Sequence, residues 1–159
     1  MNRLVVTATV LVLAVVVSGP LLAQSDPAVG TWKLNLAKSK YTNAPAPISL
    51  TRTVEAQDNG IKVSYEGEAA DGSPLAYGFT ARFDGTDYAI SGSGAPVGAD
   101  FISLRRVNMT TTEVTFRRGG TTVLIESSEV SSDGKVTTTK SKGVGANAKA
   151  SLLAVFEKQ

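Results

Sequence analysis

Three arginines interrupt runs that otherwise alternate like β-strands, and a guanidinium is the strongest binding group that this chain offers. Arg52 lies in ISLTRTVEA on the same expected face as Leu50 and Val54. Arg105 and Arg106 are adjacent in FISLRRVNM, so a regular strand sends one of them to each face. A guanidinium inside a protein must be paired or hydrogen-bonded. An inward arginine therefore anchors an anionic or carbonyl head group, pairs with an internal glutamate or water, or extends to the rim.

Other chemical groups point away from catalysis. The sequence has no histidine and no cysteine, which excludes Ser-His-Asp and Cys-His nucleophiles, zinc bound by these residues, and haem ligated by them. Glu66 and Glu68 have the spacing of a glycosidase pair, but Ile61 and Tyr65 mark the opposite face as the inward one. We therefore expect no enzyme, no catalytic residue, no metal site and no cofactor.

The segments that position these residues have the composition and the alternation of β-strands. In IKVSYEG the apolar face carries Ile61, Val63 and Tyr65, and LAYGFTARF repeats the pattern from Leu75 to Phe83. About ten strands are predicted. They are Gly30–Leu36, Ser49–Ala56, Ile61–Glu66, Leu75–Phe83, Asp87–Ser91, Phe101–Met109, Glu113–Arg117, Thr121–Val130, Lys135–Lys142 and Ser151–Glu157.

Tight-turn dipeptides separate neighbouring strands and indicate an up-and-down antiparallel order. These dipeptides favour the positive φ of hairpin turns, and they are Asn59-Gly60, Asp71-Gly72, Asp84-Gly85, Gly119-Gly120 and Asp133-Gly134. A meander of this length has two open edges unless it closes on itself. The fold class is therefore all-β, an up-and-down antiparallel barrel, with a two-sheet sandwich as the alternative.

Two segments depart from the strand pattern. Ala37–Ser49 contains Pro45 and Pro47, which leave room for one short helical turn at most. Gly92–Asp100 is rich in glycine and is interpreted as a solvated connector, although long loops at a barrel mouth often carry function.

The N-terminal residues have the layout of a secretory signal peptide. Arg3 precedes the apolar run Leu4–Val17, and Gly19, Pro20 and the small Ala23 follow it. We expect residues 1–23 to be this signal and 24–159 to be one domain, exported to the periplasm or secreted without a permanent membrane anchor. The near balance of 16 basic and 14 acidic residues gives no reason to expect a nucleic acid partner.

The ends of the predicted domain carry a family resemblance. GTWKL in the first strand and VFEK in the last resemble the calycin superfamily, which contains lipocalins and fatty-acid-binding proteins. The body of the chain resembles exported bacterial lipocalin-like proteins. The resemblance implies that Trp32 closes the barrel floor. It also places Ala154 and Phe156 where a fatty-acid-binding protein carries its carboxylate-clamping Arg and Tyr, so fatty-acid binding in the usual way is not expected.

Together these observations predict a non-catalytic protein that binds a small apolar or amphipathic molecule inside a barrel. The alternative is a solid barrel that acts as a protein-interaction or envelope-structural module. The candidate ligand-binding residues are Arg52, Arg105, Arg106, Tyr65, Tyr77, Phe79, Phe83 and Phe116, with Trp32 as the floor.

Overall fold

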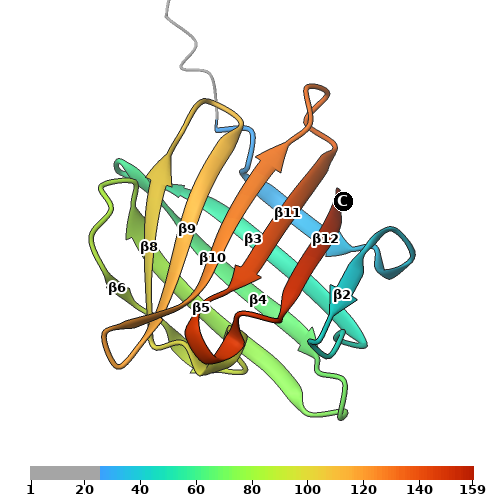
Figure 1. Cartoon of the computed structure of the whole chain (residues 1–159). Coiled ribbons are helices and arrows are strands. Elements are labelled where there is room, and N and C mark those ends of the chain that lie inside the picture. Colours follow the sequence, from blue (N-terminus) through green and yellow to red (C-terminus); the bar gives the residue numbers. More distant parts are fainter. Residues whose placement is uncertain (1–25) are drawn as a thin grey trace, which may run out of the picture.

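The computed structural model describes residues 26–159 as an all-β, nearly closed antiparallel barrel (Figure 1). The predicted signal peptide lies outside the described residues. The strands are β1 (Gly30–Leu34), β2 (Lys40–Thr42), β3 (Ser49–Gln57), β4 (Gly60–Glu68), β5 (Pro74–Arg82), β6 (Tyr88–Ala89), β7 (Ser91–Ser93), β8 (Phe101–Arg106), β9 (Thr111–Arg118), β10 (Thr121–Val130), β11 (Val136–Gly143) and β12 (Ser151–Lys158). Short 3₁₀ turns cover Leu36–Lys38, Pro96–Gly98 and Gly145–Asn147. No helix within 26–159 is long and apolar enough to span a membrane.

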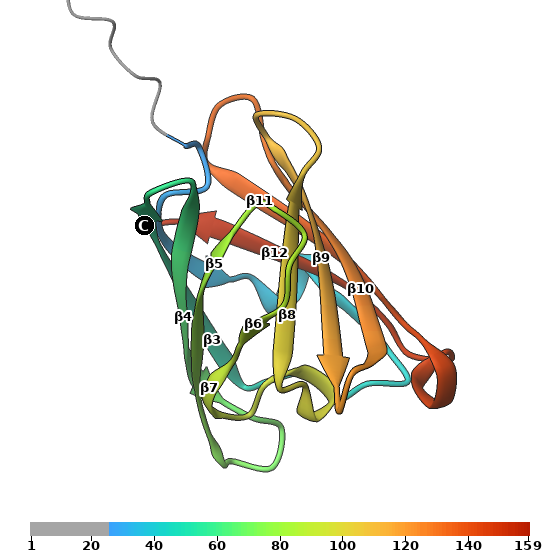
Figure 2. The same cartoon turned by 90° about the vertical axis from the view of Figure 1, so that its left-hand side faces the viewer.

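All strands belong to one sheet, in the order β6-β8-β9-β10-β11-β12-β1-β3-β4-β5-β7, and β2 pairs with β12. The predicted strand Asp87–Ser91 is split into β6 and β7. Because β6 pairs with β8 and β7 pairs with β5, this split strand bridges the two ends of the sheet (Figure 2). The barrel prediction is confirmed, and the sandwich alternative is wrong since there is no second sheet in the described part of the chain.

Several predicted strand ends are too long because side chains cap the chain earlier. The first strand ends at Leu34, since Asn35 Oδ1 accepts a hydrogen bond from the Lys38 backbone N–H at 3.1 Å and begins a 3₁₀ turn. Strand β8 ends at Arg106, since Asn108 Oδ1 accepts from the backbone N–H groups of the turn that follows. Strand β2 was not predicted.

The apolar core fills the end of the barrel at which β1 begins. Trp32 has no exposed surface, and inward side chains of the facing strands surround it, among them Val54, Val63, Phe79, Leu104 and Val114. The inward positions follow the predicted alternation, since Ile61, Val63, Phe79 and Ala81 are buried while Lys62 and Thr80 between them are exposed. Packing of this end leaves the other end of the barrel available for a site.

Candidate ligand-binding cavity

A cavity of about 310 Å³ occupies the end of the barrel opposite Trp32. Small-molecule pockets begin at roughly this size. Its wall is mainly apolar and includes Leu50, Leu75, Phe116, Leu124, Leu152, Ala154 and Phe156. The cavity reaches the protein surface, because exposed Pro45, Ala70 and Gly94 also line it.

Both segments that depart from the strand pattern form the mouth of this cavity. Tyr41, Ala44, Pro45 and Pro47 come from the segment after β1, and Gly94 to Val97 come from the glycine-rich segment before β8. The interpretation of Gly92–Asp100 as a solvated connector is therefore wrong for residues 94–97. Val97 has φ +50°, which is rare and costly for a β-branched residue, and its side chain packs against the core.

Polar groups meet in the interior where two walls of the barrel face each other. On one wall, cross-strand pairing aligns Arg52 of β3, Tyr65 of β4 and Tyr77 of β5. The two tyrosine rings are stacked, with centroids 4.6 Å apart. On the other wall, Glu126 of β10 pairs with Ser141 of β11, and the Ser141 hydroxyl donates to Glu126 Oε2 at 2.8 Å.

Arg52 lies at the boundary between the cavity and the packed end. Its side chain points inward and the residue is only 6% exposed. The guanidinium carbon is 4.7 Å from the ring centroid of Phe156, a cavity-lining residue, and 5.7 Å from that of Trp32. Among residues 26–159 no carboxylate forms an ion pair with Arg52, and its buried Nε has no hydrogen-bond partner.

Burial determines the protonation of the cavity groups. Removal from water raises the pKa of the Glu126 carboxyl, and the Ser141 hydrogen bond and the charge of Arg52 oppose this shift. Burial also raises the pKa of the Tyr65 hydroxyl and raises that of Tyr77 well above its ordinary value. The cavity wall therefore carries a carboxyl that holds its proton more tightly than usual, and the Arg52 cation lies at the boundary of the cavity.

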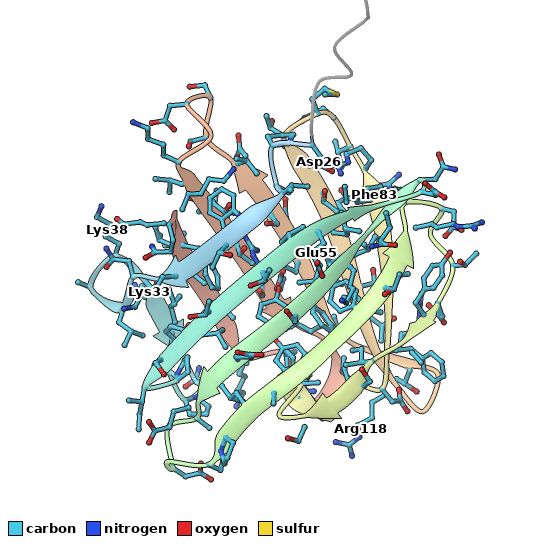
Figure 3. All side chains as sticks on the ribbon, turned by 180° about the vertical axis from the view of Figure 1, so that it is seen from behind. Asp26, Lys33, Lys38, Glu55, Phe83 and Arg118 are labelled. Carbon is cyan, nitrogen blue, oxygen red and sulfur yellow. The ribbon has the colours of Figure 1, made fainter. Side chains whose placement is uncertain are left out.

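The structure places the predicted aromatic residues in two groups. Tyr65, Tyr77 and Phe116 line the cavity. Phe79 lies in the packed core, and Phe83 lies near Asp26 at the closed end of the barrel, while Arg118 marks the opposite end (Figure 3). Phe79 and Phe83 therefore lie outside the wall of this cavity.

The two adjacent arginines both lie away from the cavity. Arg105 points outward, with 71% of its side chain exposed, and forms an ion pair with Glu113. Arg106 is the inward member of the pair, but it lies at the closed end, where it pairs with Asp26 and covers the ring of Phe83 at 3.9 Å. These contacts stabilise the closed end, so we remove both residues from the candidate site.

Trp32 lies at the closed end, where its indole Nε1–H donates to the Ala28 carbonyl at 2.8 Å. The segment before β1 thus covers the indole and satisfies its polar group. This position matches the floor role that the resemblance implies.

Sequence reasoning missed the carboxyl side of the site. Glu126 was not singled out, although TVLIESSEV places it on the same alternating face as Leu124 and Val130. The orientation of the Thr-rich strand β11 was undecided; it directs Thr139 and Ser141 inward and leaves Lys140 and Lys142 exposed. Within the described residues no cluster of three or more His, Cys, Asp or Glu residues has the geometry to hold a metal ion.

Comparisons with known proteins support the fold. No protein-family model and no curated protein sequence matches this chain. Zebrafish ileal bile acid-binding protein, solved with cholic acid, is similar with a TM-score of 0.53 and 11% identity over 84% of this chain and 99% of that chain. A redesigned β-barrel, mFAP0, solved with DFHBI, aligns over 83% of this chain and 99% of that chain with 10% identity and a TM-score of 0.46. The zebrafish likeness shows that the two chains share the fold of a β-barrel, and it concerns the fold alone.

Proposed function

We propose that this protein binds a small, mainly apolar molecule inside its barrel and performs no chemistry on it. The main support for this proposal is the cavity of about 310 Å³. Its wall is mostly aliphatic and aromatic, and the cavity opens to the surface between two loops. Removing apolar ligand surface from water contributes about 25 cal/mol per Å², so such a wall favours a compact apolar body. The zebrafish barrel of similar fold, which was solved with cholic acid, supports this proposal.

The proposed site of action is outside the cytoplasm. The support is the sequence pattern of residues 1–23, an apolar run between Arg3 and a helix-breaking Gly19-Pro20. The alternative, a solid barrel that acts only through protein contacts, is disfavoured because its own side chains do not fill the interior.

The direct test is a fluorescence titration with N-phenyl-1-naphthylamine, a neutral apolar probe. Ala154 is 5% exposed and lines the cavity, so Ala154→Leu places a larger side chain in the ligand space. We expect saturable binding at one site per chain and at least tenfold weaker binding to Ala154→Leu. The matched control is Ala76→Leu on the exposed face of β5, which should bind like the unmodified chain. Absence of saturable binding, or equal binding by both variants, contradicts the proposal.

A further inference from the structure

The carboxyl of Glu126 lies inside the barrel with one hydrogen-bond partner and, among residues 26–159, no ion-pair partner. It lies on the cavity wall, and its one hydrogen bond there is the donation from Ser141. A buried carboxyl costs stability unless its partners compensate for lost water. Arg52 would be the natural partner, yet no ion pair joins the two side chains. The charge of Arg52 acts on the Glu126 carboxyl, yet no ion pair joins them, so neither side chain satisfies the other.

The two side chains come from opposite walls of the barrel. Arg52 stands on β3 beside Tyr65 of β4, while Glu126 stands on β10 (Figure 2). The charge of Arg52 acts on the Glu126 carboxyl and on the Tyr65 hydroxyl, since it opposes the rise in pKa of both groups. The Arg52 guanidinium lies over the ring of Phe156, and Phe156 and Glu126 both line the cavity.

The charges of Arg52 and Glu126 decide which ligand head group the inner end of the cavity accepts. A protonated Glu126 donates a hydrogen bond and leaves the site with the single positive charge of Arg52. An anion is then attracted by Arg52 and hydrogen-bonded by the carboxyl. A cationic head would be repelled by Arg52, and a purely apolar ligand would leave the buried Nε unpartnered.

We propose that the ligand is an acidic amphiphile whose oxyanion head lies at the inner end of the cavity, held by the charge of Arg52 and a hydrogen bond from protonated Glu126. This inference rests on the proposed binding function and adds the chemical class of the ligand. Glu126 is then the specificity-determining residue, and its proton is bound together with the anion.

The other groups that face Glu126 do not change this assignment. Tyr41 of β2, Tyr65 of β4 and Tyr77 of β5 are the titratable side chains around it, and burial raises the pKa of each hydroxyl. They stay neutral across the range in which a carboxyl titrates. Within the described residues, Glu126 is the single charged side chain on the cavity wall itself.

The proposal fixes the sign of a pH effect. An anion beside Glu126 raises the pKa of its carboxyl further, so binding takes up a proton wherever the free protein has lost it. Affinity for the anion therefore falls as pH rises through the pKa of Glu126. A neutral ligand with the same apolar body has no such dependence.

The test compares two competitors with the same chain and different heads. Octane-1-sulfonate stays anionic at all relevant pH values, and octan-1-ol is neutral. Each displaces N-phenyl-1-naphthylamine from the full chain at pH 5 and at pH 8. We expect octane-1-sulfonate to bind at least tenfold more weakly at pH 8 than at pH 5, whereas the affinity of octan-1-ol changes by less than twofold.

Two variants assign the effect to the named residues. Glu126→Gln keeps a hydrogen-bond donor without a titrating proton, so its sulfonate affinity should not change with pH. Arg52→Met should weaken sulfonate binding at least tenfold more than it weakens octan-1-ol binding. Calorimetry in two buffers of different ionisation enthalpy should show proton uptake by the unmodified chain in the pH range where its sulfonate affinity falls, and none by Glu126→Gln.

The outcomes separate the two proposals. Failure of both competitors and the probe to bind overturns the proposed function itself. Binding of both competitors with the same pH profile, or tighter sulfonate binding at pH 8, overturns the assignment of an acidic ligand and leaves the cavity intact. Sulfonate binding that depends on pH in Glu126→Gln as it does in the unmodified chain overturns the role of Glu126.

Discussion

Arg52 is a cation with only 6% of its surface exposed, and few direct contacts compensate for this burial. Its cation–π contacts with Phe156 and Trp32 recover part of the lost hydration, but its Nε has no partner. Groups of this kind are retained when function needs them and reduce stability meanwhile. We therefore expect Arg52 to lower the stability of the fold while it contributes to ligand binding.

Replacement of Arg52 by methionine makes that conflict measurable. The thioether fills similar space without a buried charge, so Arg52→Met should raise the free energy of unfolding by about 1–2 kcal/mol. Urea denaturation provides the measurement. Arg105→Met is the control; since Arg105 is exposed, its change should stay within about 0.5 kcal/mol. A loss of stability in Arg52→Met larger than in the control would mean that Arg52 supports the fold.

The raised pKa of Glu126 predicts how stability depends on pH. The folded chain binds the Glu126 proton more tightly than the unfolded chain, in which the carboxyl has its ordinary value of 4.5. The contribution is therefore fully present below that value and is lost as pH rises through the folded pKa. Glu126→Gln removes this loss, so it should be more stable than the unmodified chain at pH 8 and equal to it near pH 4.

Urea denaturation of both chains from pH 4 to pH 8 tests this dependence. Asp71, Asp84 and Asp133 have lowered pKa values from hydrogen bonds in their turns and act with the opposite sign. These carboxyls are common to both proteins, so the difference between the two curves isolates Glu126. A difference that does not vary with pH would show that the carboxyl is not shifted by burial.

At the scale of the elements, the seam of the barrel is its weakest part. Strand β7 shares three residue pairs with β5, and β6 shares two with β8, while β3 and β4 share nine. Backbone amides held by so few neighbours open without unfolding of the whole barrel. This seam leads directly into the loop of residues 94–97 at the cavity mouth.

The rates of backbone amide hydrogen exchange should therefore differ between the seam and the rest of the sheet. We expect the amides of 88–93 to exchange at least a hundredfold faster than those in the centre of β3 and β4, and to gain protection when octane-1-sulfonate is added. Backbone-resolved exchange measured by NMR provides the readout. Equal protection of the seam and of β3 would contradict a barrel closed by a short split strand.

The individual elements also show which features of the fold could be predicted from the sequence. Period-two alternation and turn dipeptides predict the strands and their order well, because both are local signals; Asn59, for example, takes φ +59° at its hairpin turn as Asn-Gly predicts. The mouth of the cavity could not be predicted in the same way, because it depends on side-chain caps such as Asn35 and on packing between loops that are remote in sequence. The faces of Arg105 and Arg106 could be assigned only from the register of β8. The alternation in TVLIESSEV indicates an inward Glu126, but only the fold places it on the same cavity wall as Tyr65 and Tyr77.

At the scale of the whole molecule, the barrel is divided into a packed end and an end with a cavity. The packed end includes Trp32, Val63, Phe79 and Leu104, and the other end encloses the cavity of about 310 Å³. The same enlargement of a side chain should therefore have different effects at the two ends.

Two alanines make this comparison directly. Ala81 is buried in the packed core and Ala154 lines the cavity, and both point inward from strands. Ala81→Leu should lower the free energy of unfolding by about 1–3 kcal/mol because the added methylenes overpack the core. Ala154→Leu should lower it by less than about 1 kcal/mol, since its side chain extends into the cavity. Equal losses in thermal or urea denaturation would contradict the division of the barrel.

The central claim is that this barrel holds a small molecule, and native mass spectrometry of the full chain purified from an exporting host tests it most directly. The account predicts a co-purifying species bound at one per chain, which solvent extraction identifies as an acidic amphiphile and which Ala154→Leu lacks. A bare protein mass in both proteins, together with no uptake of N-phenyl-1-naphthylamine or octane-1-sulfonate, would contradict the claim.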